Sequence, residues 1–202
     1  MIVIIDYDMG NIGSIMNMIK KAGGNAVCSS DTNVIKNAEK LILPGVGAFD
    51  KGMNNLKELG IIELLDKKVI EEKTPVLGIC LGMQLMTKKS EEGELNGLGW
   101  INAETKRFVF NDKSLKIPHM GWDNITIQKQ DMIFEETEEN QRFYFVHSYY
   151  VDCYETNDIL CKTNYGREFV SGFRKNNIFG FQFHPEKSHK YGLKLIKNFI
   201  MV

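Results

Sequence analysis

One cysteine in this sequence stands where a nucleophile would be placed. The apolar run Pro75–Ile79 leads directly into Gly78-Ile79-Cys80-Leu81-Gly82, and a helix-like segment begins near Leu81. A buried strand followed by Gly-x-Cys-x-Gly and a helix is the cysteine version of a nucleophile elbow. The start of a helix favours a thiolate, and the Leu81 N–H is expected to be free to face a developing oxyanion. Most unpaired cysteines are small buried core residues, but this context favours Cys80 as a nucleophile.

A base for this cysteine must come from the four histidines of the chain. His184 stands in Phe181-Gln182-Phe183-His184-Pro185-Glu186, after a run with aromatic residues at alternate positions. The run predicts a strand end, and in an extended segment the two-residue spacing turns Glu186 to the same side as His184. A carboxylate there can hold one imidazole nitrogen and leave the other for the thiol. A His-x-Glu pair alone usually lies on the protein surface and has no catalytic role. Together with the elbow it predicts a Cys80, His184, Glu186 triad, whose order is not that of the α/β-hydrolases.

A second backbone feature closes another expected strand. The segment Leu43–Phe49 contains Gly45 and Gly47 on either side of Val46. Glycines at these positions let the backbone approach a substrate and turn N–H groups inward, which suits the second half of an oxyanion hole. Without the elbow, an ordinary strand-to-helix turn would explain this segment equally well.

The elements that position these residues alternate in type along the first half of the chain. Strands are expected at Met1–Asp6, Ala26–Cys28, Lys40–Leu43 and Pro75–Ile79, and helices from Asn11 to Gly23-Gly24, between Phe49 and Glu72, and from Leu81. Such alternation predicts a parallel sheet with helices on both of its faces. The carboxyl ends of these strands would then share one edge with Cys80.

The second half of the chain has a different pattern. Strand-like segments are Ile101–Phe110, Asn124–Gln128, Arg142–Val151, Ile159–Asn164, Phe169–Lys175 and Ile178–Phe183, and a helix is expected over Ser188–Val202. Turn residues between these strands indicate antiparallel additions. We therefore expect a single α/β domain over residues 1–202, with a mostly parallel central sheet and antiparallel strands in the second half.

Composition excludes several classes of function. A formal net charge of -1 provides no field that would gather nucleic acid or an anionic membrane. No apolar run approaches the roughly 20 residues of a membrane-spanning helix. The four cysteines show neither metal-ligand spacing nor a dense disulfide framework, so the expected compartment is the reducing cytoplasm.

Several motifs, taken in order along the chain, resemble the class I (triad) glutamine amidotransferases, and within them the glutaminase subunits of imidazole glycerol phosphate synthases. The motifs are Gly10-Asn11, Pro44-Gly45-Val46-Gly47-Ala48-Phe49, Gly78-Ile79-Cys80-Leu81-Gly82-Met83-Gln84, Pro118-His119-Met120-Gly121-Trp122, Tyr144-Phe145-Val146-His147-Ser148-Tyr149 and Gly180-Phe181-Gln182-Phe183-His184-Pro185-Glu186-Lys187-Ser188. The resemblance runs nearly from end to end.

The resemblance implies a role for each motif. Cys80 would be the nucleophile, His184 the general base and acid, and Glu186 the residue that orients the imidazole. Gln84, His147 and Ser148 would bind L-glutamine, and Val46, Gly47 and Leu81 would lie around the oxyanion hole. No metal or organic cofactor is implied. The products would be glutamate and ammonia, formed through a glutamyl thioester.

The family also implies a partner, a (β/α)₈-barrel cyclase that uses the ammonia. The residues expected near its docking surface are Asn11, Met120, Trp122 and Lys187. Core packing would explain Met120 and Trp122 equally well. Two positions near that surface depart from the family pattern. Gly13 stands where a larger residue is common, and Asp123 where asparagine is usual.

Other functions remain open at this point. A paralogous subunit could supply ammonia for amidating surface sugars instead of for histidine biosynthesis. A cysteine peptidase or deglycase of related fold also uses an elbow cysteine, although His184-Pro185-Glu186 does not favour it. A binding module that kept the fold without the activity is disfavoured by the intact Cys80, His184 and Glu186.

Overall fold

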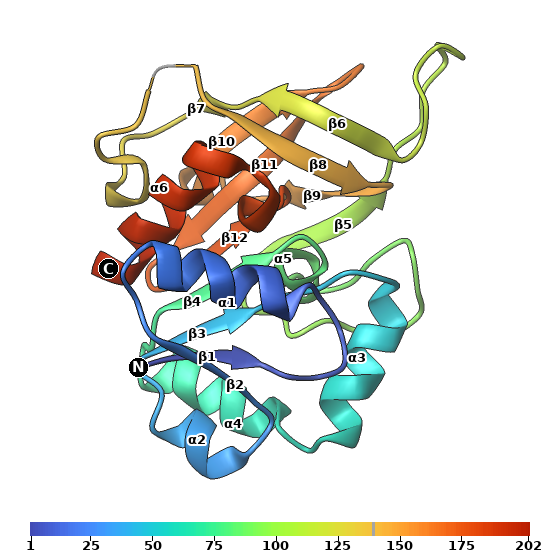
Figure 1. The fold of residues 1–202 in the computed structure, drawn as a ribbon. Coiled ribbons are helices and arrows are strands. Elements are labelled where there is room, and N and C mark those ends of the chain that lie inside the picture. Colours follow the sequence, from blue (N-terminus) through green and yellow to red (C-terminus); the bar gives the residue numbers. More distant parts are fainter. Residues whose placement is uncertain (139) are drawn as a thin grey trace.

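The computed structural model describes residues 1–138 and 140–202, and its largest element is a mixed sheet (Figure 1). The strand order is β2-β1-β3-β4-β12-β11-β10-β7, with β9 paired to β11 and β5 paired to β9. The parallel part consists of β1 (Ile2–Ile5), β2 (Ala26–Ser29), β3 (Lys40–Leu43), β4 (Val76–Ile79) and β12 (Ile178–Phe181). The antiparallel part consists of β5 (Ala103–Arg107), β7 (Thr126–Ile127), β9 (Tyr149–Cys153), β10 (Ile159–Asn164) and β11 (Glu168–Lys175).

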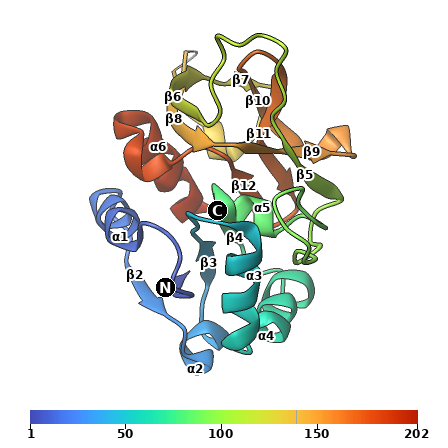
Figure 2. The same ribbon diagram turned by 90° about the vertical axis from the view of Figure 1, so that its right-hand side faces the viewer.

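Helices cover both faces of the parallel part, as expected (Figure 2). One face carries α1 (Ile12–Lys21) and α6 (His189–Met201), and the other carries α2 (Thr32–Lys36), α3 (Phe49–Glu58) and α4 (Ile62–Asp66). A π-helical turn over Lys67–Glu71 continues α4, and α5 (Leu81–Leu85) follows β4 directly. Single 3₁₀ turns span Met132–Phe134, Thr156–Asp158 and Pro185–Lys187.

The apolar core lies in two layers separated by the sheet. In β1, Val3 and Ile5 pack into the layer beneath α3 and α4, while Ile2 and Ile4 pack into the layer beneath α1 and α6. Successive side chains of a strand point to opposite faces, so a strand covered on both faces must be apolar throughout. The uninterrupted apolar run Ile2–Ile5 therefore contributes side chains to both layers of the core.

The strand β12, which the sequence analysis grouped with the antiparallel additions, is antiparallel to β11 and joins the two parts of the sheet. It pairs in parallel with β4, with Gly180 opposite Gly78 and Phe181 opposite Ile79. The Cys80 N–H donates to the Phe181 carbonyl at 2.8 Å, which extends the ladder by one bond. Because the two strands end side by side, the residues after β12 are delivered to the position of the elbow.

A small two-stranded sheet stands beside the main one. It consists of β6 (His119–Asn124) and β8 (Arg142–His147), which are antiparallel. The expected strand Asn124–Gln128 is present but shorter, since β7 covers only Thr126–Ile127. The strand β6, which precedes it, was not expected. The expected strand Arg142–Val151 is two strands, β8 and β9, interrupted at Ser148, where the His147 Nδ1–H donates to the Tyr149 carbonyl at 2.7 Å.

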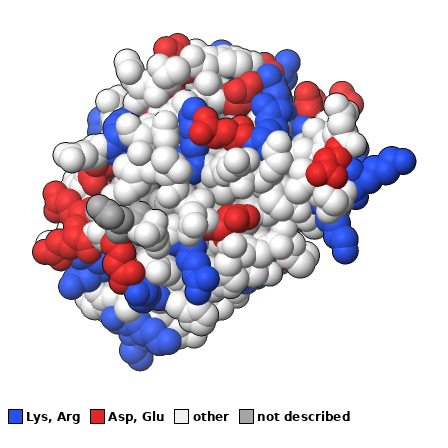
Figure 3. All heavy atoms as spheres, turned by 90° about the horizontal axis from the view of Figure 1, so that it is seen from above, with Lys and Arg blue, Asp and Glu red and all other residues white. Residues whose placement is uncertain are grey.

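The surface carries charge of both signs. Figure 3 shows acidic and basic side chains intermixed on one face, with uncharged residues between them. Within residues 1–138 and 140–202, no helix is long and apolar enough to cross a membrane. All four cysteines are free thiols.

Candidate active site

Cys80 occupies a strained turn between β4 and α5. Its backbone has φ 53° and ψ -109°, a conformation that costs free energy for a residue with a side chain. The flanking glycines are required by packing. A Cβ at Gly82 would collide with the Leu43 carbonyl oxygen, and one at Gly78 would lie 2.8 Å from the Met83 nitrogen. The elbow expected from the sequence is therefore present, with the thiol at its apex.

His184 and Glu186 form a buried pair. His184 Nδ1 and Glu186 Oε1 are 2.9 Å apart, and both side chains are almost completely buried. The backbone route differs from the expected one, because Pro185 begins a 3₁₀ turn instead of continuing an extended segment. This turn brings the Glu186 carboxylate back beneath the ring. His184 Nε2 has no hydrogen-bond partner among the described residues, which leaves it available to Cys80.

The protonation of His184 follows from these neighbours. Burial by itself disfavours the imidazolium. The Cys80 sulfur and the Glu186 carboxylate outweigh burial and raise the pKa of His184 to about 10. The imidazolium is therefore the favoured form of His184 at neutral pH.

The oxyanion hole differs from the expectation. The Leu81 N–H, expected to be free, donates to the Gly45 carbonyl at 3.3 Å. A Cβ at Gly45 would lie 2.7 Å from the Gly82 nitrogen, so this close approach needs a glycine. Val46 is 42% exposed and Gly47 has φ 120°, a conformation that favours glycine. The donor beside Cys80 is thus occupied by a protein carbonyl.

A pocket of about 290 Å³ opens in front of Cys80. Its lining residues are Val46, Gly47, Cys80, Leu81, Gln84, Glu92, Pro118, Val146, His147, Ser148 and Tyr149. The structure therefore gathers the expected substrate-binding residues around the thiol, and its size suits a small substrate.

Glu92 was missed by the sequence analysis. Its carboxylate accepts a hydrogen bond from the Phe49 N–H at 2.9 Å, and burial raises its pKa. It stands in the acidic run Glu91-Glu92-Gly93-Glu94, a pattern typical of a solvated loop. No local signal distinguishes Glu92 from its neighbours, because only the folded loop brings it to the pocket.

Two side chains in the wall of the pocket donate hydrogen bonds to the same backbone carbonyl, that of Tyr149. The Tyr149 oxygen accepts from His147 Nδ1 at 2.7 Å and from Gln84 Nε2 at 3.2 Å. The other ring nitrogen of His147 lies 3.0 Å from His119 Nδ1, and His119 Nε2 lies 2.7 Å from Asp123 Oδ2. Since both ring nitrogens of His147 bind protein groups, what this residue offers a ligand is its backbone.

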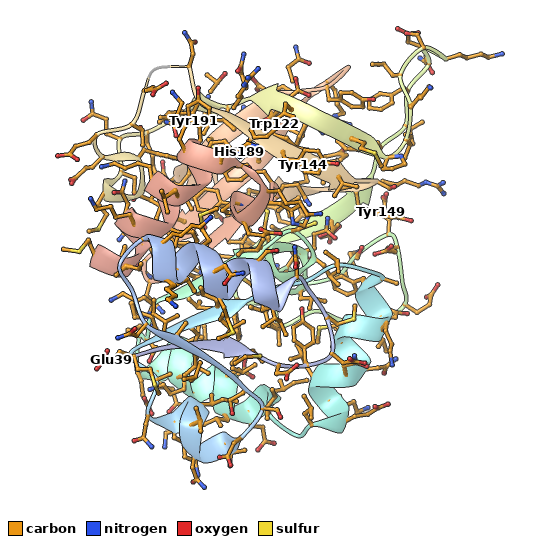
Figure 4. All side chains as sticks on the ribbon, viewed as in Figure 1. Glu39, Trp122, Tyr144, Tyr149, His189 and Tyr191 are labelled. Carbon is orange, nitrogen blue, oxygen red and sulfur yellow. The ribbon has the colours of Figure 1, made fainter. Side chains whose placement is uncertain are left out.

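The expected partner-facing residues lie outside the core. Met120 is 61% exposed and Trp122 is 38% exposed, so core packing does not explain them. Trp122 stacks on His189 with ring centroids 5.4 Å apart, and Lys187 lies over the ring of Tyr144. Figure 4 shows Trp122, Tyr144 and His189 together where β6, β8 and the start of α6 meet.

Comparison with known proteins places this geometry in context. The family described as glutamine amidotransferase class-I matches residues 3–202. The chain is 58% identical over 200 residues to imidazole glycerol phosphate synthase subunit HisH 2 of Methanococcus maripaludis, covering 99% of this chain and 98% of that one. It is 49% identical, with the same coverage, to the protein of that name from Pseudomonas aeruginosa.

Solved structures share the fold at lower identity. A crystal structure of a glutamine amidotransferase has a TM-score of 0.71 at 18% identity, covering 96% of this chain and 98% of that one. PurLQS from Thermotoga maritima has a TM-score of 0.67 at 19% identity, with coverage of 99% and 97%. These two structures support the mixed α/β architecture.

Proposed function

The chain belongs to the class-I glutamine amidotransferase family, and we propose that it is the glutaminase subunit of an imidazole glycerol phosphate synthase. In this role it hydrolyses L-glutamine through a thioester on Cys80. The observation that carries this assignment is the buried His184–Glu186 pair, whose free Nε2 is available to the elbow cysteine at the head of the pocket. Cys80, His184 and Glu186 are the proposed catalytic residues.

The first half of the reaction begins from the thiolate and the imidazolium. The Cys80 sulfur attacks the side-chain amide carbon of glutamine, and the carbonyl oxygen takes up the negative charge. Collapse of this intermediate breaks the C–N bond while His184 Nε2 gives its proton to the departing nitrogen. Ammonia leaves, and a glutamyl thioester remains on Cys80.

The second half restores the enzyme with one water molecule. Neutral His184 takes a proton from water, and the hydroxide adds to the thioester carbon. The C–S bond then breaks, glutamate leaves, and the thiolate again faces an imidazolium. Glu186 accepts from Nδ1 in both halves, which holds the ring with Nε2 toward the sulfur.

Glutamine binding is assigned to the polar groups around the pocket. Both N–H groups of Gln84 are engaged by protein oxygens, so its Oε1 is what remains to accept from the substrate. Glu92 supplies a carboxylate for the α-ammonium group. The backbone of His147 and Ser148 lines the opposite wall.

The ammonia is used by a partner subunit. We infer a cyclase of the (β/α)₈-barrel type, because two similar proteins are named as subunits of an imidazole glycerol phosphate synthase and the family resemblance implies such a partner. The proposed docking surface includes Asn11, Met120, Trp122 and Lys187, and its exposed Met120 and Trp122 are the side-chain types enriched in interfaces. We place the enzyme in the cytoplasm, where its four free cysteines would stay reduced.

A second candidate keeps the chemistry and changes the acceptor. A paralogous subunit that supplies ammonia for surface-sugar amidation would also need this site. Gly13 and Asp123, which depart from the family pattern near the docking surface, favour keeping this candidate. The acceptor consumed by the partner distinguishes the two.

The test combines turnover with covalent labelling. The chain, alone and with a cyclase-type barrel subunit, is assayed for glutamate release from glutamine and for cleavage of a peptide panel. We expect glutamine hydrolysis only, and labelling of Cys80 by a glutamine-analogue electrophile. Peptide cleavage would reassign the chain as a peptidase, and absence of labelling would favour a non-catalytic module.

A further inference from the structure

The side-chain amide of Gln84 has only one possible orientation. Its Nε2 lies 3.2 Å from the Tyr149 carbonyl oxygen, and a carbonyl can only accept a hydrogen bond. The nitrogen of Gln84 must therefore face Tyr149. The other N–H of the same nitrogen points to Gln182 Oε1, at 3.0 Å.

The orientation of Gln182 follows from that of Gln84. Because its oxygen accepts from Gln84, its nitrogen must turn the other way, and Nε2 lies 3.6 Å from Cys80 Sγ. The side chain is completely buried, and the Gln182 backbone N–H donates to Ser171 at 3.0 Å. The amide is therefore held with a donor aimed at the sulfur.

A second group near the sulfur acts in the opposite sense. The Val146 carbonyl lies 4.0 Å from Cys80 Sγ, where it can accept from the thiol but would repel a thiolate. An N–H donor favours the charged form of an acceptor, and the sulfur accepts best when it is ionised. The balance between thiol and thiolate thus depends on Gln182 as well as on His184.

We propose that Gln182 is a further catalytic residue, whose carboxamide donates to the Cys80 sulfur and stabilises the thiolate that attacks and later leaves. Gln84 and the Tyr149 carbonyl are positioning groups that fix the direction of this donor. Gln182 stands two residues before His184, so a single chain segment brings both partners of the sulfur to the elbow. The consequence for glutamine turnover rests on the proposed function, whereas the effect on the thiol does not.

The test measures Cys80 alkylation by iodoacetamide in the isolated chain as a function of pH, since the thiolate is the reactive form. Gln182→Met removes the donor and keeps the volume. We expect it to raise the midpoint of the pH profile by about half to one unit, a three- to tenfold loss of rate below the midpoint. Gln182→Glu keeps the shape, places a carboxylate beside the sulfur, and should raise the midpoint further.

Gln141→Met is the matched control, because Gln141 is another buried glutamine whose amide donates to Thr137 and not to the sulfur. It should leave the midpoint unchanged. Equal midpoints in the wild type, Gln182→Met and Gln182→Glu would overturn the proposal. If Gln182→Met does not fold, the isosteric Gln182→Glu decides the question alone. If the Gln182 variants shift the alkylation midpoint but the wild-type chain has no glutaminase activity, the effect of Gln182 on the sulfur stands and the proposed function is refuted.

Discussion

The Leu81 N–H and the Gly45 carbonyl oxygen lie 3.3 Å apart in a hydrogen bond at the mouth of the pocket. The bond removes a donor that an oxyanion on the substrate would need. A hole that lacks one donor loses roughly 3–4 kcal/mol of transition-state stabilisation, a factor of about a hundred or more in rate. Gly45 and Gly47 give the segment the backbone freedom to release Leu81.

We therefore expect the isolated chain to hydrolyse glutamine slowly and a docked barrel subunit with its acceptor to accelerate it about a hundredfold. The physical cause would be rotation of the Gly45 carbonyl away from Leu81. Glutamate release is measured for the chain alone, with the barrel, and with barrel and acceptor. Equal and fast rates in all three conditions would contradict gating, although not the assignment to the family.

Hydrolysis of glutamine should depend on only one of the four cysteines, Cys80. Cys80→Ala is expected to abolish glutamate release, because no other group can form the thioester. Cys28→Ala, Cys153→Ala and Cys161→Ala should retain most of it. Burial raises the pKa of Cys28 to about 11 and those of Cys153 and Cys161 to about 12, so these thiols stay protonated. Appreciable turnover by Cys80→Ala would end the thioester mechanism.

The local parts of the site could be predicted from the sequence. Apolar runs bounded by proline or glycine place the ends of β3 and β4 at Leu43 and Ile79 as expected. The elbow around Cys80 and the contact between His184 and Glu186 depend on neighbours within a few residues. The structure confirms both of these arrangements.

Other features could not be predicted, because they depend on contacts between residues far apart in the sequence or on a strand whose polar side chain is buried and whose apolar side chains are exposed. In β6, Met120 and Trp122 face outward while His119 is buried, the opposite of the usual alternation. The Leu81–Gly45 bond and the approach of Gln182 to Cys80 join residues far apart in sequence. No periodicity in a single strand or helix carries this information.

Substitutions of His184 and Glu186 should reduce the rate of glutamine hydrolysis by different amounts. His184→Ala is expected to slow both thioester formation and its hydrolysis, since one imidazole serves both steps. Glu186→Gln should be milder, because an amide oxygen can still accept from Nδ1 at the 2.9 Å distance seen here. Single-turnover kinetics with glutamine separates the two steps. If Glu186→Gln were the more damaging change in a folded protein, the roles would be wrong.

Acid should destabilise the fold through His147. Burial lowers its pKa from 6.5 to about 3, so the folded protein keeps it neutral while the unfolded chain is protonated. Stability is fully present above pH 6.5 and is lost as the pH falls toward 3, by about 3 kcal/mol at pH 4. The raised pKa of His184 contributes stability that is fully present below pH 6.5 and is lost as the pH rises from 6.5 toward 10, so it does not cause the loss in acid.

His147→Gln tests this directly, since an amide can also donate to Tyr149 and does not titrate. Urea unfolding at pH 7, 5.5 and 4 should show a markedly smaller loss of stability in the variant than in the wild type. The same loss in both proteins would show that His147 is not the group responsible.

Docking of the partner should depend on Trp122 and Lys187 while the chemistry of Cys80 does not. Trp122 stacks against His189 and lies beneath Arg142, so its ring is held in place while 38% of the residue stays exposed. Truncating an aromatic anchor at the centre of an interface typically costs 2 kcal/mol or more, about thirtyfold in affinity. Trp122→Ala should therefore weaken binding of the barrel subunit by about that factor, and Lys187→Ala by less, because rim charges contribute little.

The control for Trp122→Ala is Tyr154→Ala, which removes an exposed aromatic ring immediately after β9. Affinity is measured by titration calorimetry, and Cys80 is alkylated with iodoacetamide in each variant. We expect weakened affinity only for Trp122→Ala and Lys187→Ala, with alkylation at the wild-type rate in all three. The ring lies on β6 and the thiol after β4, in separate sheets, so its removal leaves the elbow in place. Unchanged affinity in Trp122→Ala would move the docking surface elsewhere, because no interface centred on β6 could tolerate the loss of its largest exposed side chain.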